Sequence, residues 1–214
     1  MISKPVYLVG GGGHAKVVIA ALREAGLSVG GVFDDDPAKY GLSMQGVKVI
    51  GPIEQALSYT DRGKFIIAIG DNVRRGQMIE RLDGLQWQTV IHPKAYVHES
   101  VRIGAGTLVT AGVVIQPDTI VGQHCIINTG STIDHDCRIS SFAHIAPGAH
   151  LAGAVQVGEG AMIGVGSSII PNIKVGSWVT VGAGSVVVRD LPSGITAAGA
   201  PARELKTGNL RDER

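Results

Sequence analysis

The chain has 214 residues, of which 44% are hydrophobic and 17% are charged, and its formal net charge is +1. This composition is typical of a soluble protein with one or two domains, and so small a net charge gives no reason to expect nucleic acid or an anionic membrane as a partner. The first residues lack the regions of a signal peptide, and no run of about 18 apolar residues is present. We therefore expect a cytoplasmic protein without a membrane span.

The first part of the chain predicts a small α/β domain of the Rossmann-like type. An apolar run at residues 6–9 enters a glycine cluster, and residues 14–25 form a predicted helix. The next predicted elements are strands at residues 29–33 and 64–69 and helices at residues 53–59 and 73–82. Strands that alternate with helices are typical of a parallel sheet, and we assign this domain to residues 1–88.

All three predicted strands end in polar or glycine-rich segments. These segments are Gly12-Gly13-His14, Asp34-Asp35-Asp36 and Gly70-Asp71-Asn72. Ligands of parallel sheets bind at the carboxyl ends of the strands, and a glycine loop before a helix N-terminus favours phosphate. We therefore expect a phosphate-containing ligand at this edge, although the glycines could also form nothing more than a tight strand-to-helix turn.

Residues 10–15 also fit the dinucleotide fingerprint, with Ala15 in the last place. Asp34 lies about twenty residues further on, where an acidic side chain would bind a ribose hydroxyl. This pattern makes an NAD-linked oxidoreductase an alternative. Against it, the segment has room for only one half of a doubly wound fold. The segment is not a Walker-type phosphate loop either, because no Gly-Lys-Ser/Thr is present.

The second part of the chain is a repeat with a period of six. From Ile91 to Val187 every sixth residue is aliphatic, without an insertion. Helices place apolar residues about 3.6 positions apart and half-buried strands about 2 apart, so this period indicates a solenoid in which each hexapeptide is one unit. We expect an all-β parallel β-helix at residues 89–192, with the aliphatic row pointing inward and glycines at the corners.

The hexapeptide pattern resembles that of the hexapeptide-repeat acyltransferases, whose left-handed β-helices have eighteen residues per coil. Together with the glycine-loop domain, the whole chain resembles the sugar acetyltransferases of the NeuD and PglD type. The resemblance implies that the first domain binds a nucleotide sugar and that the β-helix binds acetyl-CoA. It places the nucleotide-sugar site at Gly12, Gly13, His14, Asp34, Asp35 and Gly70.

One corner of the repeat carries polar groups that stacking does not require. His135 occupies a corner position between Asp134 and Asp136. Transfer of an acetyl group to an amine needs a base, and an imidazole near neutrality is the usual one. We expect His135 to be this base. The resemblance assigns Asp136 as the carboxylate that orients it, with Asp134 as the second possibility and a merely solvated corner as the alternative.

The same resemblance assigns residues to the acetyl donor. The segment from Ala198 to Arg203 resembles the Gly-x-Pro-Ala-Arg ending of the family, so residues 193–214 are expected to form a tail that packs near CoA. The predicted acetyl-CoA residues are His144, Val165, Gly182, Ala183 and Arg203. Family members are trimers with the CoA groove between neighbouring β-helices, so a homotrimer is expected.

The other histidines and the cysteines have no motif that assigns them a role. We expect surface positions for His92, His98, His124 and His150, and no metal site, because no three ligands converge. Cys125 and Cys137 are twelve residues apart, on different faces of an eighteen-residue coil. We therefore expect buried thiols without a disulfide.

The resemblance predicts an acetyl-CoA-dependent N-acetyltransferase that acts on a UDP- or GDP-linked 4-amino-4,6-dideoxy sugar in bacterial surface glycan biosynthesis. Acetyl-CoA would be a co-substrate, and transfer would be direct within a ternary complex. Family frequency favours UDP as the carrier. A sialic acid O-acetyltransferase remains an alternative, as do a noncatalytic nucleotide-sugar-binding scaffold and the oxidoreductase.

Overall fold

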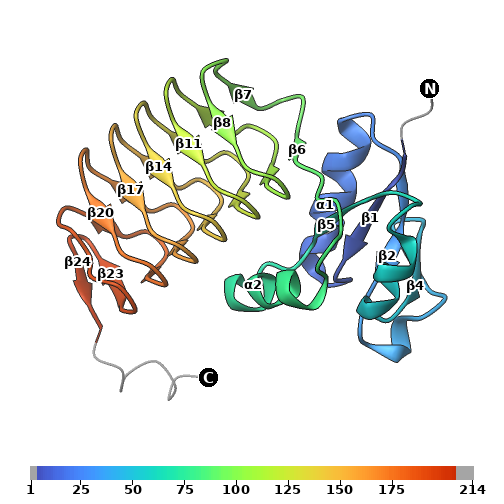
Figure 1. The fold of residues 1–214 in the computed structure, drawn as a ribbon. Coiled ribbons are helices and arrows are strands. Elements are labelled where there is room, and N and C mark those ends of the chain that lie inside the picture. Colours follow the sequence, from blue (N-terminus) through green and yellow to red (C-terminus); the bar gives the residue numbers. More distant parts are fainter. Residues whose placement is uncertain (1–3, 206–214) are drawn as a thin grey trace.

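The computed structural model describes residues 4–205. A small α/β domain is followed by a parallel β-helix, so the predicted fold class is confirmed (Figure 1). The first domain contains the strands β1 (Val6–Val9), β2 (Val29–Phe33), β3 (Ser43–Met44), β4 (Val47–Gly51) and β5 (Lys64–Ile67), and the helices α1 (Gly13–Glu24), η1 (Pro37–Lys39), η2 (Ile53–Tyr59) and α2 (Asn72–Arg81).

The strands of the first domain form one sheet in the order β3-β4-β2-β1-β5, which is parallel except for the β3–β4 hairpin. Successive side chains of a strand point to opposite faces of the sheet. Val6 and Leu8 accordingly pack with α1, whereas Tyr7 and Val9 pack with η2 and α2. Both faces of the sheet are therefore covered, as expected for parallel strands.

Three local predictions in this domain need correction. The helix at Ile53–Tyr59 is a 3-10 helix, and the third predicted strand ends at Ile67. The β3–β4 hairpin was not predicted. It turns on Gln45 and Gly46, which both have positive φ, as in the two-residue turns that join hairpins.

The β-helix is built from two-residue strands. They are β6 (Val90–Ile91), β7 (Tyr96–Val97), β8 (Arg102–Ile103), β9 (Leu108–Val109), β10 (Val114–Ile115), β11 (Ile120–Val121), β12 (Ile126–Ile127), β13 (Thr132–Ile133), β14 (Arg138–Ile139), β15 (His144–Ile145), β16 (His150–Leu151), β17 (Gln156–Val157), β18 (Met162–Ile163), β19 (Ser168–Ile169), β20 (Lys174–Val175), β21 (Thr180–Val181) and β22 (Val186–Val187). The strands β23 (Thr196–Gly199) and β24 (Ala202–Glu204) follow the last coil.

Three strands make one coil, so every third strand pairs in parallel with its equivalent in the next coil. We name the three sheets by their first strands: the β6 sheet (β6-β9-β12-β15-β18-β21-β23-β24), the β7 sheet (β7-β10-β13-β16-β19-β22) and the β8 sheet (β8-β11-β14-β17-β20). The second residue of each strand belongs to the aliphatic row, and most of these side chains fill the interior. Ile127, Ile145 and Val187, for example, are fully buried.

The three corners between the sheets differ at the position where the backbone has positive φ. At the corner from the β6 sheet to the β7 sheet this position is always glycine, namely Gly112, Gly130, Gly148, Gly166 and Gly184. At the β7–β8 corner it carries a side chain, namely Asp118, Asp136, Ala154 and Asn172. At the β8–β6 corner it is either glycine or a residue with a large ring, namely Gly106, His124, Phe142, Gly160 and Trp178.

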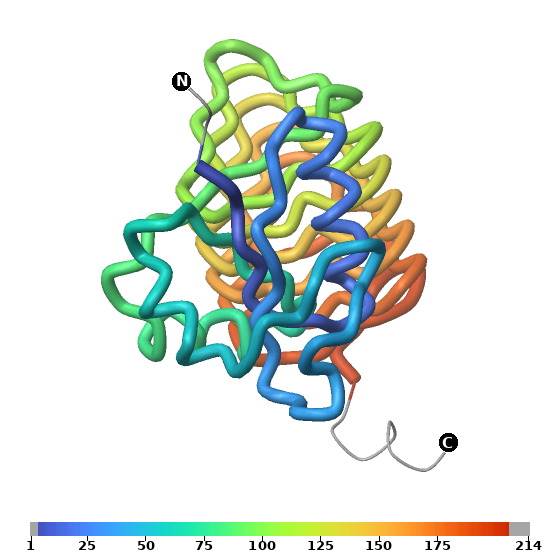
Figure 2. Tube along the Cα trace, turned by 90° about the vertical axis from the view of Figure 1, so that its right-hand side faces the viewer, coloured from blue at the N-terminus to red at the C-terminus, as the bar shows by residue number. Residues whose placement is uncertain are grey.

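The first domain docks on the β6 sheet (Figure 2). The first residue of each strand points outward, and on the first two strands of the β6 sheet these residues are Val90 and Leu108. Both are buried in the same core as Val18 and Leu22 of α1. The apolar outer column of one sheet therefore joins the two parts of the chain.

Candidate functional site

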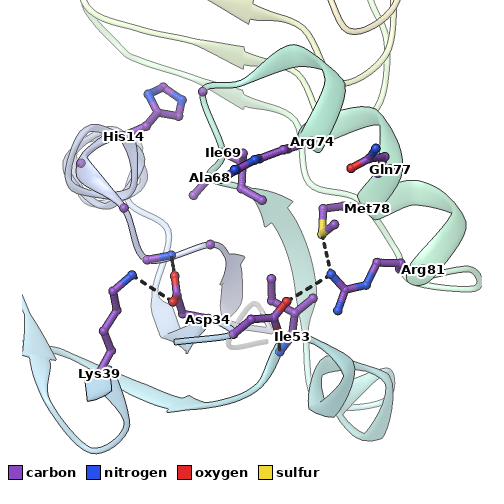
Figure 3. A pocket seen from close by; sticks show the side chains of 16 residues that line it. His14, Asp34, Lys39, Ile53, Ala68, Ile69, Arg74, Gln77, Met78 and Arg81 are labelled. Atoms are coloured by element: carbon purple, nitrogen blue, oxygen red, sulfur yellow. Dashed lines mark hydrogen bonds and ion pairs between the residues drawn. The ribbon is translucent and has the colours of Figure 1, made fainter. Parts of the chain in front are cut away.

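A pocket of about 520 Å³ opens at the carboxyl ends of β1, β2 and β5 (Figure 3). Its lining includes all six residues predicted for the nucleotide-sugar site, namely Gly12, Gly13, His14, Asp34, Asp35 and Gly70. Helix α2 forms part of the wall with Arg74, Gln77, Met78 and Arg81. The three polar strand ends thus meet, because β2, β1 and β5 are neighbours in the sheet.

Asp34 binds the glycine loop through hydrogen bonds. One carboxylate oxygen accepts the Gly11 N–H at 2.6 Å, and the other accepts the Asp36 N–H at 3.0 Å and the Lys39 ammonium at 2.9 Å. Burial alone would raise the pKa of Asp34, but these hydrogen bonds and the Lys39 charge bring it below its usual value. Asp34 is therefore ionised and engaged within the protein, unlike the ribose-binding acid that the dinucleotide fingerprint predicts.

The rest of the pocket favours an anion. Helix α1 begins after Gly12, which provides no side-chain cap, so the first N–H groups of the helix remain available. Asp35 accepts the Ile53 N–H and pairs with Arg81, which also binds Glu54. Among residues 4–205, Arg74 has no ion-pair partner, so its charge is available to a ligand in the pocket.

His144 is buried and His14 is half-buried near the seam between the two domains. Burial and the charge of Arg75 lower the pKa of His14 to about 4 and that of His144 to about 3. Both rings are therefore neutral at pH 7. One nitrogen of each, Nε2 of His14 and Nδ1 of His144, is buried without a hydrogen-bond partner among the described residues.

Asn128 fixes the tautomer of His144. The Asn128 amide oxygen accepts the N–H and the hydroxyl of Thr129, which sets the orientation of the amide. Its nitrogen therefore donates to His144 Nε2 at 3.1 Å. The His144 proton is then on Nδ1, so the ring offers one N–H donor at the seam and cannot bind a proton at Nε2 without losing Asn128.

His135 lies at the β7–β8 corner and, unlike His14 and His144, is exposed. Its side chain is 59% exposed, and its Nδ1 lies 2.8 Å from Asp136 Oδ2. Asp134 instead accepts the main-chain N–H of His135. The hydrogen bond from the ring to Asp136 raises the pKa of His135 above its usual value and leaves Nε2 free to accept a proton. Of the two flanking carboxylates, Asp136 is the one in contact with the ring.

Gly153, which is not among the predicted site residues, makes room for this imidazole. In the next coil Gly153 lies directly against the His135 ring, so that a Cβ there would be 2.6 Å from His135 Cε1 and 2.7 Å from Nε2. The φ of Gly153 is not positive, so its backbone does not require glycine. Glycines are common at corners, and nothing in the sequence singles this one out.

Three of the five residues predicted for acetyl-CoA lie at the β6–β7 corner, whereas His144 and Arg203 lie on strands of the β6 sheet. Val165, Gly182 and Ala183 belong to this corner, and the Val165 side chain is 53% exposed. Added Cβ atoms at Gly130, Gly148, Gly166 and Gly184 would meet nothing within 4 Å. The corner is thus an open edge of backbone along several coils. Arg203 lies on β24, exposed, while residues 206–214 of the predicted tail lie outside the described residues.

Two predictions about histidines are wrong. His92 and His124 were expected on the surface but are buried. His124 lies under the first domain, edge-on to Trp87 and stacked on Phe142. A corner residue that would be exposed on an isolated β-helix is covered here because a second domain docks on it. Arg75, in the adjacent helix α2, was not singled out and is also buried.

No group of three or more His, Cys, Asp or Glu side chains within residues 4–205 is arranged to hold a metal ion. Across the same part of the chain, no helix has the length and apolar character needed to cross a membrane. Cys125 and Cys137 are both free and buried, and burial raises the pKa of each thiol to about 11.

Comparison with known protein families and relatives gives two family matches. Residues 5–82 match the model of the PglD N-terminal domain, and residues 154–189 match that of the bacterial transferase hexapeptide (six repeats). The UDP-N-acetylbacillosamine N-acetyltransferase of Bacillus subtilis (strain 168) is 44% identical over 116 residues. That alignment spans 50% of this chain and 52%, about half, of the curated relative.

Two solved structures are similar over nearly the whole chain. A mutant of perosamine N-acetyltransferase from Caulobacter crescentus, in complex with CoA and GDP-perosamine, is 43% identical, with a TM-score of 0.89 and coverage of 94% of this chain and 97% of that one. The acetyltransferase domain of PglB from Neisseria gonorrhoeae FA1090, in complex with acetyl coenzyme A, is 38% identical, with a TM-score of 0.88 and coverage of 95% and 100%.

Proposed function

This chain belongs to the family of hexapeptide-repeat sugar N-acetyltransferases with a PglD N-terminal domain, and we propose that it transfers the acetyl group of acetyl-CoA to the amine of a nucleotide-linked 4-amino-4,6-dideoxy sugar. The pocket of the first domain is where the nucleotide sugar binds. The relatives named above have UDP- or GDP-linked sugars in their names, which supports one of these two carriers for this chain. The uncapped start of α1 and the Arg74 side chain support binding of the diphosphate.

The proposed base and the acceptor pocket lie on opposite sides of one chain. The first domain docks on the β6 sheet, and His144 projects from that sheet. The three sheets enclose a triangular prism, in which the β7–β8 corner is the one corner that does not border the β6 sheet. His135 lies at that corner, so within a single chain it cannot reach a substrate bound between the first domain and the β6 sheet.

The outer face of the β7 sheet supports self-association that solves this problem. Its outward residues are Tyr96, Val114, Thr132, His150, Ser168 and Val186, without a lysine, arginine or carboxylate. The β8 sheet presents Arg102, Arg138 and Lys174 instead. Three copies with their β7 sheets around a common axis place the β7–β8 corner of one copy beside the β6–β7 corner of the next. The site would then combine His135 of one copy with the glycine corner and His144 of its neighbour.

The chemistry follows from the His135–Asp136 pair. The proton on His135 Nδ1 is held by Asp136, so Nε2 accepts a proton as the sugar amine attacks the thioester carbonyl carbon. A carbon–nitrogen bond forms, the carbon–sulfur bond of the tetrahedral intermediate breaks, and the imidazolium returns the proton to the CoA sulfur. Cys125 and Cys137 are buried thiols of raised pKa, which argues against an acyl-enzyme route.

The single observation that carries the proposal is the exposed His135–Asp136 pair at a corner where folding requires no ionisable group. The test is thiol release from acetyl-CoA with UDP-, GDP- and CMP-linked amino sugars and free sialic acid. We expect release with a UDP- or GDP-linked 4-amino sugar. Release with sialic acid alone would indicate O-acetylation, whereas binding of a nucleotide sugar without release from any acceptor would overturn the enzymatic proposal.

A further inference from the structure

We infer that Arg75 is a positioning residue that fixes the acceptor-binding domain on the β-helix. It thereby keeps the loop at Gly70 at a constant distance from the ring of His144. The inference rests on the proposed function for its reaction, but its structural basis is independent of the substrate. Arg75 is 1% exposed and lies in α2, between the pocket and the coils. Among residues 4–205 it has no carboxylate partner within ion-pair distance.

One edge of the guanidinium binds two successive coils. Arg75 Nε donates to the carbonyl oxygen of His124 at 2.8 Å, and Nη2 donates to that of Phe142 at 2.7 Å. These two residues occupy the same position of the β8–β6 corner in neighbouring coils, which are stacked about 4.8 Å apart. A planar group with parallel N–H bonds can span two such carbonyls. Arg75 therefore fixes α2 along the axis of the β-helix.

The other side of the guanidinium binds the loop that follows β5. Nη1 donates to the carbonyl oxygens of Ile69 and Gly70, both at 3.1 Å, and Nη2 also donates to the Asn72 side-chain oxygen at 2.8 Å. The Asn72 amide in turn donates to the Gly160 carbonyl, one coil beyond Phe142. Ile69 and Gly70 both line the acceptor pocket. One side chain thus connects the pocket wall directly to the β-helix.

No other side chain can make this set of bonds. The guanidinium has five N–H groups, and each finds an acceptor, four of them main-chain carbonyls. Lysine has three donors and lacks the planar arrangement. Although burial lowers the pKa of Arg75 to about 10, the side chain remains charged at pH 7. Its charge lies at the seam, where burial together with this charge keeps His14 and His144 neutral.

The two carbonyls are presented by strained residues. His124 and Phe142 have φ of 52° and 61°, a region that residues with large side chains rarely occupy. Their rings stack at 5.6 Å with an interplanar angle of 7°. Strained backbone persists where the surrounding structure holds it, often at functional sites. Here the two residues whose rings stack are also the ones whose carbonyls Arg75 binds.

The experiment compares Arg75→Met and Arg75→Lys with the wild-type protein. The binding of GDP, UDP and CoA is measured by calorimetry, each alone, and kcat is measured by thiol release at saturating substrates. Because a displacement of about 1 Å can reduce turnover by about 10²-fold, we expect kcat of Arg75→Met to fall by about that factor while each dissociation constant changes less than about threefold. Arg75→Lys should recover part of the loss.

Arg102→Met removes the same charge from an exposed position on the β8 sheet and should leave all these values unchanged. Amide hydrogen exchange at residues 69–72 gives a readout without substrate, and it should accelerate in Arg75→Met. If Arg75→Met does not fold, Asn72→Ala, which removes one acceptor of Arg75, is measured in the same way. Unchanged kcat in the folded variant, or binding lost in proportion to kcat, would overturn the inference. Absence of turnover in the wild-type protein would instead contradict the proposed function.

Discussion

The two corners that border the β7 sheet have the same backbone geometry but carry different residues. Both place one residue per coil in the left-handed region. At the β6–β7 corner that residue is glycine in five successive coils, whereas at the β7–β8 corner it is Asp118, Asp136, Ala154 or Asn172. Stacking alone therefore does not decide which residue stands at a corner.

The residue type at each corner matches the role that we propose for that corner. A row of glycines leaves main-chain groups open to a long ligand, as the empty space around Gly148 and Gly166 indicates. At the other corner a carboxylate in the left-handed position reaches back to the preceding imidazole. Asp tolerates this conformation better than most residues do. In our proposal the first corner binds the donor and the second supplies the base, and neither suffices alone.

The largest expected effect comes from removing the base. His135→Ala should lower kcat by about 10² to 10⁴-fold, the usual contribution of a general base, with little change in CoA binding. The measurement is thiol release with the acceptor identified in the panel. His98 stands at the same corner two coils earlier, and His98→Ala should retain full activity. Equal losses in the two variants would refute the assignment of His135.

The next effect concerns the carboxylate. Asp136→Asn keeps a residue that tolerates positive φ but removes the charge that holds the His135 proton on Nδ1. Asp136 raises the pKa of His135, and the base must be unprotonated. The activity of the wild-type protein should therefore already decline at a pH above the usual pKa of a histidine. In Asp136→Asn kcat should be lower at every pH, and the acidic limb of kcat/KM should move to lower pH. An unmoved limb would contradict the pairing.

A smaller loss is expected at the residue beneath the ring. Gly153→Ala introduces a Cβ within 2.7 Å of His135 Nε2, so the exposed ring must move rather than the backbone. We expect kcat to fall by about tenfold, since catalytic geometry is sensitive to displacements of about 1 Å. The melting temperature should stay close to that of the wild-type protein. A large drop in melting temperature would show that the ring cannot move aside and that the effect is on folding.

The smallest expected effects test the backbone strain at the positive-φ positions of the two corners. Gly148→Ala places a Cβ in open space but in the left-handed region, so it should destabilise the fold by about 1 kcal/mol. Ala154→Gly relieves the same strain at the other corner and should be neutral or slightly stabilising. Denaturant unfolding measures both. If Ala154→Gly destabilises as much as Gly148→Ala, the two corners are not equivalent in backbone strain.

The repeat was predictable because each inward residue follows one rule, so that Ile91 to Val187 specify the coil register directly. His135 was also predictable as a proposed base, since it departs from what stacking needs. The sequence also carries a signal for Arg75: positions 75 and 78 share one face of α2 with the C-cap residue at position 82, and Met78 and Leu82 are apolar and buried. The burial of His124 had no such signal, because docking of one domain on another leaves no period in the sequence.

The central claim is that each active site takes the His135 corner from one copy and the glycine corner from the next. The direct test mixes two inactive chains, His135→Ala and Val165→Trp, the second of which fills the open β6–β7 corner at an exposed position. After unfolding and joint refolding, about a quarter of the sites should combine two intact halves, because each site draws them from different chains at random. Recovery of about a quarter of wild-type thiol release is the predicted result. No recovery, with mixed oligomers formed, would place both halves of the site in one chain and contradict the account.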